Sequence, residues 1–131
     1  MDAVLAARVE RIAADELHGS SWLAREAVAA VVEAAQRGED PLALARELVR
    51  ARPDVGSIAG ALGRVLVAGR TTEQLVEEAD ALISSRERAA ATIAVLLRAE
   101  LEERVVMTHS ASATAREALA HAGPGRVVCT V

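Results

Sequence analysis

The spacing of apolar residues changes once along this chain, near Arg104, and this change constrains the fold more than any other feature of the sequence. Before Arg104, small and branched aliphatic residues recur at intervals of three and four, which predicts amphipathic helices. After it come two short runs rich in valine, Arg104–Thr108 and Arg126–Val131, which are typical of buried strands. The sequence therefore predicts a mainly α protein that ends in a strand, a helix and a second strand.

Helix start and stop signals divide the first part of the chain into about five helices. Asp40 and Pro41 provide an N-cap and a first-turn proline, and Thr71 with Gln74 fits a capping box. The glycine at position 38 suits the end of the second helix. The predicted helices span approximately residues 2–17, 21–36, 40–53, 55–68 and 71–103.

The strand–helix–strand segment is the βαβ unit of a parallel sheet. We expect two domains, a helical N-terminal domain over residues 1–103 and, over 104–131, the start of a truncated Rossmann-like α/β domain. Two buried strands do not make a stable sheet alone. We therefore expect the segment after about Glu103 either to associate through its strand edges or to be disordered.

Composition excludes several classes of protein. Trp22 is the one aromatic residue among Phe, Trp and Tyr, so the core is built from aliphatic side chains that let helices approach closely. A net charge of −4 and no stacking aromatics argue against nucleic-acid binding. No run is apolar enough to cross a membrane, so a cytoplasmic protein is the simple expectation. The single Cys129 is expected to be buried and inert.

The residues from Thr108 to Ser112 form the first candidate site, because they lie where a parallel strand leads into a helix. Ligands of open α/β folds bind at this edge, and free N–H groups at a helix start attract phosphate. His109, Ser110 and Ser112 would contribute further hydrogen bonds. The alternative is that Ser110 and Ser112 cap the helix while His109 pairs with a backbone carbonyl, and the frequency of capping serines favours it.

A second candidate is the turn His18–Ser21, in which Gly19 and Ser20 would present donors to an anion. The alternative is an ordinary connection between helices, which is the more frequent use of such a turn. His18, His109 and His121 lack the spacing of metal ligands, so neither a metal nor a cofactor is expected.

Three segments resemble the translation initiation factor 2B alpha/beta/delta family, which also includes methylthioribose 1-phosphate and ribose 1,5-bisphosphate isomerases. The start of the second helix is similar to that of the family, the Thr-His-Ser segment looks like its "(I/V)LTHS-S-(T/A)" sequence, and the last strand resembles its next strand. These segments are Gly19–Ala24, Val106–Thr114 and Gly125–Val131.

This resemblance implies an N-terminal helical bundle followed by a Rossmann-like domain, and a ligand near Gly19, Ser20, His109, Ser110 and Ser112. It implies a regulatory or assembly subunit that pairs with itself or with homologous subunits and holds a phosphorylated sugar or nucleotide. The alternative is a ribose 1,5-bisphosphate isomerase type of enzyme.

In the isomerases a cysteine stands where this chain has Ser110, an aspartate further along completes the pair, and an arginine stands at the position of His18. A hydroxyl is far less acidic than a thiol, so these differences favour the regulatory branch. No catalytic residue is assigned, and Ser110 is the candidate if the protein is an enzyme. A third class, a purely helical interaction module, predicts that residues past Arg104 can be removed.

Overall fold

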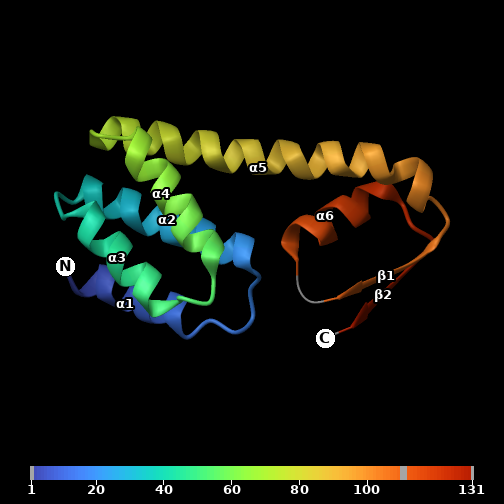
Figure 1. The fold of residues 1–131 in the computed structure, drawn as a ribbon, viewed down its shortest axis with the longest axis horizontal. Helices are drawn as coiled ribbons and strands as arrows, with labels where there is room; N and C mark the ends of the chain where they lie inside the picture. Colours follow the sequence, from blue (N-terminus) through green and yellow to red (C-terminus); the bar gives the residue numbers. More distant parts are fainter. Residues whose placement is uncertain (1, 110–111, 131) are drawn as a thin grey trace. The chain divides into compact units, whose positions relative to one another are not determined.

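The computed structural model describes residues 2–109 and 112–130, and it is mainly helical as predicted. Figure 1 shows the order of its elements. They are α1 (Ala3–Ala13), α2 (Ser20–Gln36), α3 (Pro41–Ala51), α4 (Gly56–Ala68), α5 (Thr72–Leu101), β1 (Val105–His109), α6 (Ala113–Ala122) and β2 (Arg126–Thr130).

Contacts divide the chain into two compact units, which we call the helical unit (Met1–Ile83) and the strand unit (Ser84–Val131). The first part of α5 belongs to the helical unit and the rest of that helix belongs to the strand unit. The predicted domain boundary after Glu103 is placed at the change from helix to strand, and not by contacts. This boundary stays a prediction.

The helices of the helical unit begin where the sequence signals indicate. The Asp40 carboxylate accepts hydrogen bonds from the N–H groups of Leu42 and Ala43 at 2.9 and 3.2 Å. Thr71 and Gln74 form the reciprocal capping box, since each side chain accepts a hydrogen bond from the other's N–H at 3.3 Å. These caps satisfy donors that no helix can satisfy internally, which is why short sequence motifs fix the helix starts.

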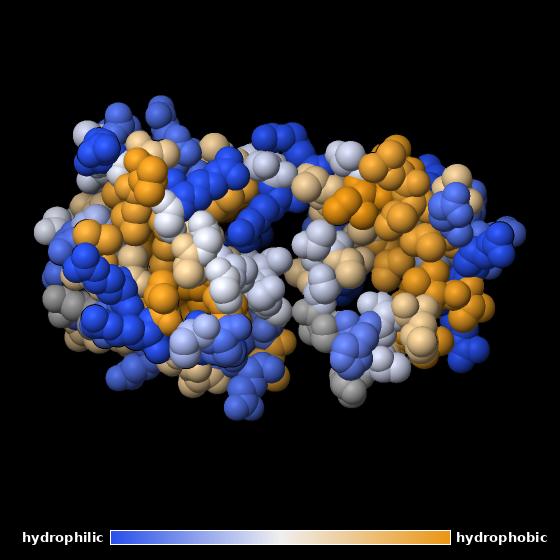
Figure 2. Space-filling model, in the orientation of Figure 1, coloured by the Kyte–Doolittle hydropathy of each residue, from blue (hydrophilic) through white to orange (hydrophobic). Residues whose placement is uncertain are grey.

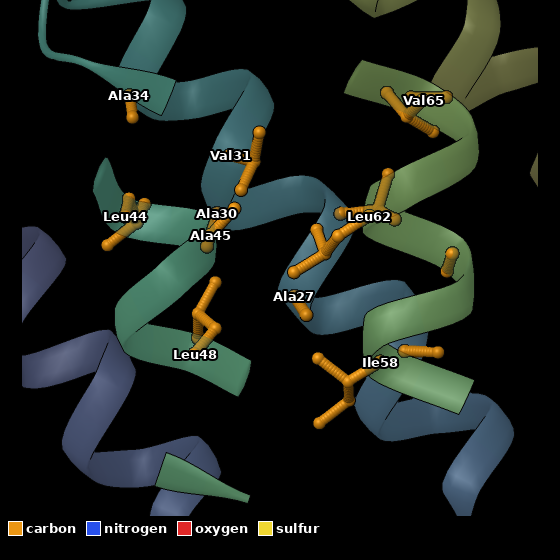
Figure 3. Close-up of a cluster of buried hydrophobic side chains, with 14 of the residues drawn as sticks. Ala27, Ala30, Val31, Ala34, Leu44, Ala45, Leu48, Ile58, Leu62 and Val65 are labelled. Carbon is orange, nitrogen blue, oxygen red and sulfur yellow. The ribbon is translucent and has the colours of Figure 1, made fainter. Parts of the chain in front are cut away.

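Helix α2 lies at the centre of the core of this unit. Figure 3 shows buried side chains of α3 on one side of α2 and buried side chains of α4 on the other. Ala27, Ala30 and Ala34 of α2 are wholly inaccessible to solvent. Their small side chains let the neighbouring helices approach closely, so the expectation of an aliphatic, alanine-based core is confirmed. The largest fully buried side chains are Leu5, Ile12, Leu23, Leu48, Ile58, Leu62, Val28, Val31 and Val65.

The first helix ends earlier than predicted, at Ala13 and not near Leu17. The guanidinium of Arg52, distant in sequence, donates hydrogen bonds to the carbonyls of Ile12 and Asp15 at 3.3 and 2.7 Å. The Asp15 carboxylate then accepts from the N–H of Leu17 and holds a turn. Leu17, predicted to be an apolar helix position, is therefore 85% exposed.

The strand unit contains the predicted βαβ arrangement. Strands β1 and β2 pair in parallel, with Val105 opposite Arg126 and His109 opposite Thr130. Helix α6 connects them and buries Ala118 and Ala122. Gly123 closes α6 in the left-handed conformation at φ 71°, where glycine has no steric penalty.

The expectation that both strands are buried is wrong for this unit. Side chains along β1 alternate between exposed and half-buried, and Met107 is 76% exposed. Cys129 is exposed as well, which contradicts the prediction of a buried thiol. The physical reason is that the described residues supply two strands and the short helix α6, which is too little to cover both faces of a sheet.

We predict that Leu48→Ala lowers the free energy of unfolding of the helical unit by about 2–5 kcal/mol, because it leaves a cavity in a fully buried site. The fluorescence of Trp22, which packs against this core, reports unfolding in denaturant. Leu17→Ala removes the same atoms from an exposed position and should change stability by less than about 0.5 kcal/mol. Equal losses in the two variants would contradict the assigned core.

Candidate functional site

The start of α2 presents backbone donors without a capping side chain. Gly19 is the N-cap residue, with φ −75° and ψ 168°, and no side chain accepts a hydrogen bond from the first turn. The Gly19 carbonyl accepts from the N–H groups of Trp22 and Leu23 at 3.1 and 3.2 Å, so the helix is regular from its first turn. The exposed Ser20 follows directly. The positive end of the helix dipole thus meets solvent where the sequence predicted an anion site.

The turn before α2 is held by Asp15, which the sequence analysis did not identify. One carboxylate oxygen accepts from the N–H groups of Leu17 and His18 at 3.1 and 2.8 Å, and the other lies 2.7 Å from Nδ1 of His18. The imidazole of His18 stacks on the indole of Trp22 with ring centroids 3.8 Å apart. An aspartate three residues before a histidine was the available signal, since aspartate commonly accepts from backbone N–H groups two and three residues ahead.

These hydrogen bonds also set the charge of the turn. The hydrogen bonds from the backbone N–H and the ring of His18 hold the pKa of the Asp15 carboxyl below its usual value. Asp15 is therefore ionised at neutral pH and favours a proton on Nδ1 of His18. On the far side of the turn, the hydroxyl of Ser57 donates to the Ser20 carbonyl at 2.9 Å and ties the start of α2 to α4.

In the strand unit, His109 lies at the end of β1 and its ring pairs with β2. Nδ1 of His109 is 3.0 Å from the hydroxyl oxygen of Thr130, and that hydroxyl donates to the Thr108 carbonyl at 3.4 Å. Since a hydroxyl has one proton, it accepts from Nδ1, and the second ring nitrogen, Nε2, remains for a ligand. Within the described residues, the partner of the His109 ring is a side-chain hydroxyl and not the backbone carbonyl of the alternative.

Ser112 is the N-cap of α6. Its hydroxyl accepts a hydrogen bond from the N–H of Ala115 at 3.2 Å, as the capping alternative predicted. This bond uses one acceptor site of the hydroxyl and leaves its proton available to a ligand oxygen. Ser110 lies outside the described residues, so both its binding role and its catalytic candidacy stay predictions.

Four of the five predicted site residues lie in the described part of the chain and fall into two groups, with Gly19 and Ser20 in the helical unit and His109 and Ser112 in the strand unit. That the two groups serve one ligand stays a prediction. Within residues 2–109 and 112–130, no three side chains of His, Cys, Asp or Glu come together as metal ligands. Over the same residues, no helix combines the length and the apolar character that a membrane span requires.

We predict that Asp15→Asn lowers the free energy of unfolding at neutral pH. Because the pKa of Asp15 is lower in the folded chain, its contribution is complete above the unfolded pKa of about 3.9 and is lost as the pH falls through the folded pKa. The difference between wild type and variant in Trp22-detected unfolding should therefore shrink in acid. Glu16→Gln removes the same charge from a neighbour that makes no hydrogen bond within the described residues, and it is the control. A difference that stays constant from pH 7 to pH 3 would refute this assignment.

Of three comparisons with known proteins, one found a similar protein, and it supports the predicted fold. No protein-family model matches the chain, and no curated protein matches it. Among solved structures, the chain is similar to a translation initiation factor eIF-2B from Pyrococcus horikoshii OT3, with 21% sequence identity and a TM-score of 0.74. The match covers 93% of this chain and 46% of that protein, so this chain spans about half the length of its neighbour. The chain therefore has the fold of about half of an eIF-2B protein, as the sequence resemblance implied.

Proposed function

We propose that this chain is an initiation-factor-2B-like protein of the alpha/beta/delta type, which acts as a regulatory or assembly subunit and binds a phosphorylated sugar or nucleotide. The observation that carries the proposal is the pair of helix starts at Gly19 and Ser112, which lie in two of the three segments that resemble the family. The fold likeness to an eIF-2B protein over 93% of the chain supports the same family.

The chemistry of each helix start suits a phosphoryl group. At α2 the first-turn N–H groups have no side-chain acceptor, and the ring of His18 stacks on the side chain of Trp22 in that turn. At α6 the Ser112 hydroxyl keeps a proton that it can donate to a phosphoryl oxygen near the positive end of the helix dipole. Among the described residues, neither group contains an activated nucleophile or a pair of carboxylates suited to acid–base catalysis, and in the sequence Ser110 stands where the isomerases have a cysteine. No observation favours the isomerase alternative.

The test is an NMR titration of the full chain with inorganic phosphate and with ribose 1,5-bisphosphate. We expect the amide signals of Ser20–Trp22 and of Ser112 to move, because these amides lie at the two helix starts, and the family resemblance extends the expectation to Ser110. Movement confined to other parts of the chain would overturn the proposed site.

Substitutions that cap the helix while changing its charge separate binding from folding. Gly19→Asp and Ser112→Asp each place a capping carboxylate at the helix start, so they should keep the fold and weaken phosphate binding about tenfold or more. Gly19→Asn and Ser112→Asn cap the same helices without charge and are the matched controls. Equal binding by the Asp and Asn variants would contradict an anion site.

The proposed assembly with like or homologous chains is supported by the exposed apolar face of the strand unit, where Val105 and Met107 are largely accessible. We predict that native mass spectrometry detects dimers or larger species, and that Met107→Glu reduces them because a charge cannot be buried in such a contact. Leu17→Glu places the same charge on an exposed residue of the helical unit and should leave the oligomers unchanged. A monomer at all concentrations would contradict the assembly role.

A further inference from the structure

The helical unit carries a second feature that the helix starts do not explain, an apolar groove between α3 and α4. The groove has a volume of about 340 Å³. Leu42 and Val49 of α3 line one wall, and Leu66 of α4 lines the other. Figure 2 shows apolar surface over α3 and α4, bordered by strongly hydrophilic side chains.

One glycine keeps the α4 wall of the groove low. Gly63 lines the groove, and Gly60 lies one turn earlier on the exposed face of the same helix, where each glycine costs roughly 0.5–1 kcal/mol relative to alanine. A Cβ atom at either position would meet nothing within 4 Å, so the packing of the described residues gives no reason for glycine. Gly56, Gly60, Gly63 and Val67 follow one another at intervals of four, three and four, and all four are exposed on one helix face.

The groove is bordered by positive charge. Arg46 and Arg50 line it from α3. Arg50 pairs with Glu47 at 3.2 Å. Arg46 makes no ion pair within the part of the chain that the structure describes. An occupant of this groove would therefore gain from apolar contact along its floor and from carboxylates along its edges.

We propose that this groove binds an acidic amphipathic helix of a partner protein. A helix fits because glycine on α4 lets another backbone approach closely, and a groove between two helices accepts the apolar ridge of a third. A second copy of this chain docked on the same face about a two-fold axis would bring Arg46 and Arg50 against their own copies, which is unfavourable. A flat bilayer would not reach the groove beside Gly63.

The probe for this proposal is a pair of synthetic helical peptides, each about 18 residues long, with the same Leu and Ala stripe. One peptide carries Glu on its polar face and the other carries Lys. With the full chain, we expect the Glu peptide to bind about tenfold more tightly than the Lys peptide in fluorescence anisotropy. Arg46→Glu with Arg50→Glu should reverse this preference.

Filling the groove gives an independent test. Gly63→Leu should weaken binding of the Glu peptide about tenfold or more, because the side chain occupies the approach over α4. Gly63→Ala keeps the floor low and should raise the stability of the helical unit, which Trp22 fluorescence in denaturant measures. Gly63→Leu is checked for folding in the same way. Binding that is unchanged in Gly63→Leu would overturn the proposal.

Three other results would also overturn the proposal. One is that neither peptide binds. Another is a dimer in sedimentation that Gly63→Leu abolishes, which would assign the groove to a second copy. The last is binding to vesicles of phosphatidylserine with phosphatidylcholine but not to the Glu peptide, which would assign it to a membrane surface. Since none of these outcomes involves the helix starts at Gly19 and Ser112, the proposed phosphate sites stand or fall separately.

Discussion

The contact of α3 and α4 with the alanine face of α2 is the interaction on which the rest of the helical unit depends. With one tryptophan and neither phenylalanine nor tyrosine, the chain cannot fill its core with large rings. It brings helix backbones close together over Ala27, Ala30 and Ala34, which are inaccessible to solvent, and fills the remaining space with leucine, isoleucine and valine. Dispersion contacts along closely approaching helices supply the cohesion that aromatic residues supply elsewhere.

The same helix connects the core to the candidate site. The buried middle of α2 fixes the direction of its first turn, and the turn before it is fixed by local hydrogen bonds. Asp15 holds His18, His18 stacks on Trp22, and Ser57 of α4 holds the Ser20 carbonyl. The donors at Gly19 are therefore presented by a packed element on a supported turn, which keeps them in place before a ligand arrives.

Features that depend on neighbouring residues could be predicted from the sequence, and features that depend on distant partners could not. The N-cap at Asp40 and the capping box of Thr71 with Gln74 join residues that are at most three positions apart. A short sequence motif is therefore enough to predict each of them. The early end of α1 depends on Arg52, which donates a hydrogen bond to the carbonyl of Asp15. The two residues are 37 positions apart in the sequence. The exposure of Met107 and Cys129 depends on which layers cover the sheet. To predict that Thr130 is the partner of His109, one must know the register of the two strands, and the periodicity of the sequence alone does not give it.

Hydrogen exchange measured by mass spectrometry, with and without ribose 1,5-bisphosphate, tests the central claim that one helix both organises the core and offers free donors to an anion. The account predicts that amides from Ala27 to Ala34 are the slowest to exchange in the chain, because they open only with the whole helical unit. It predicts that the amides of Ser20 and Ser21 exchange quickly in the free chain and become slower when the sugar phosphate is added. Rapid exchange in the middle of α2, or a start of α2 that the ligand leaves unchanged, would contradict the account.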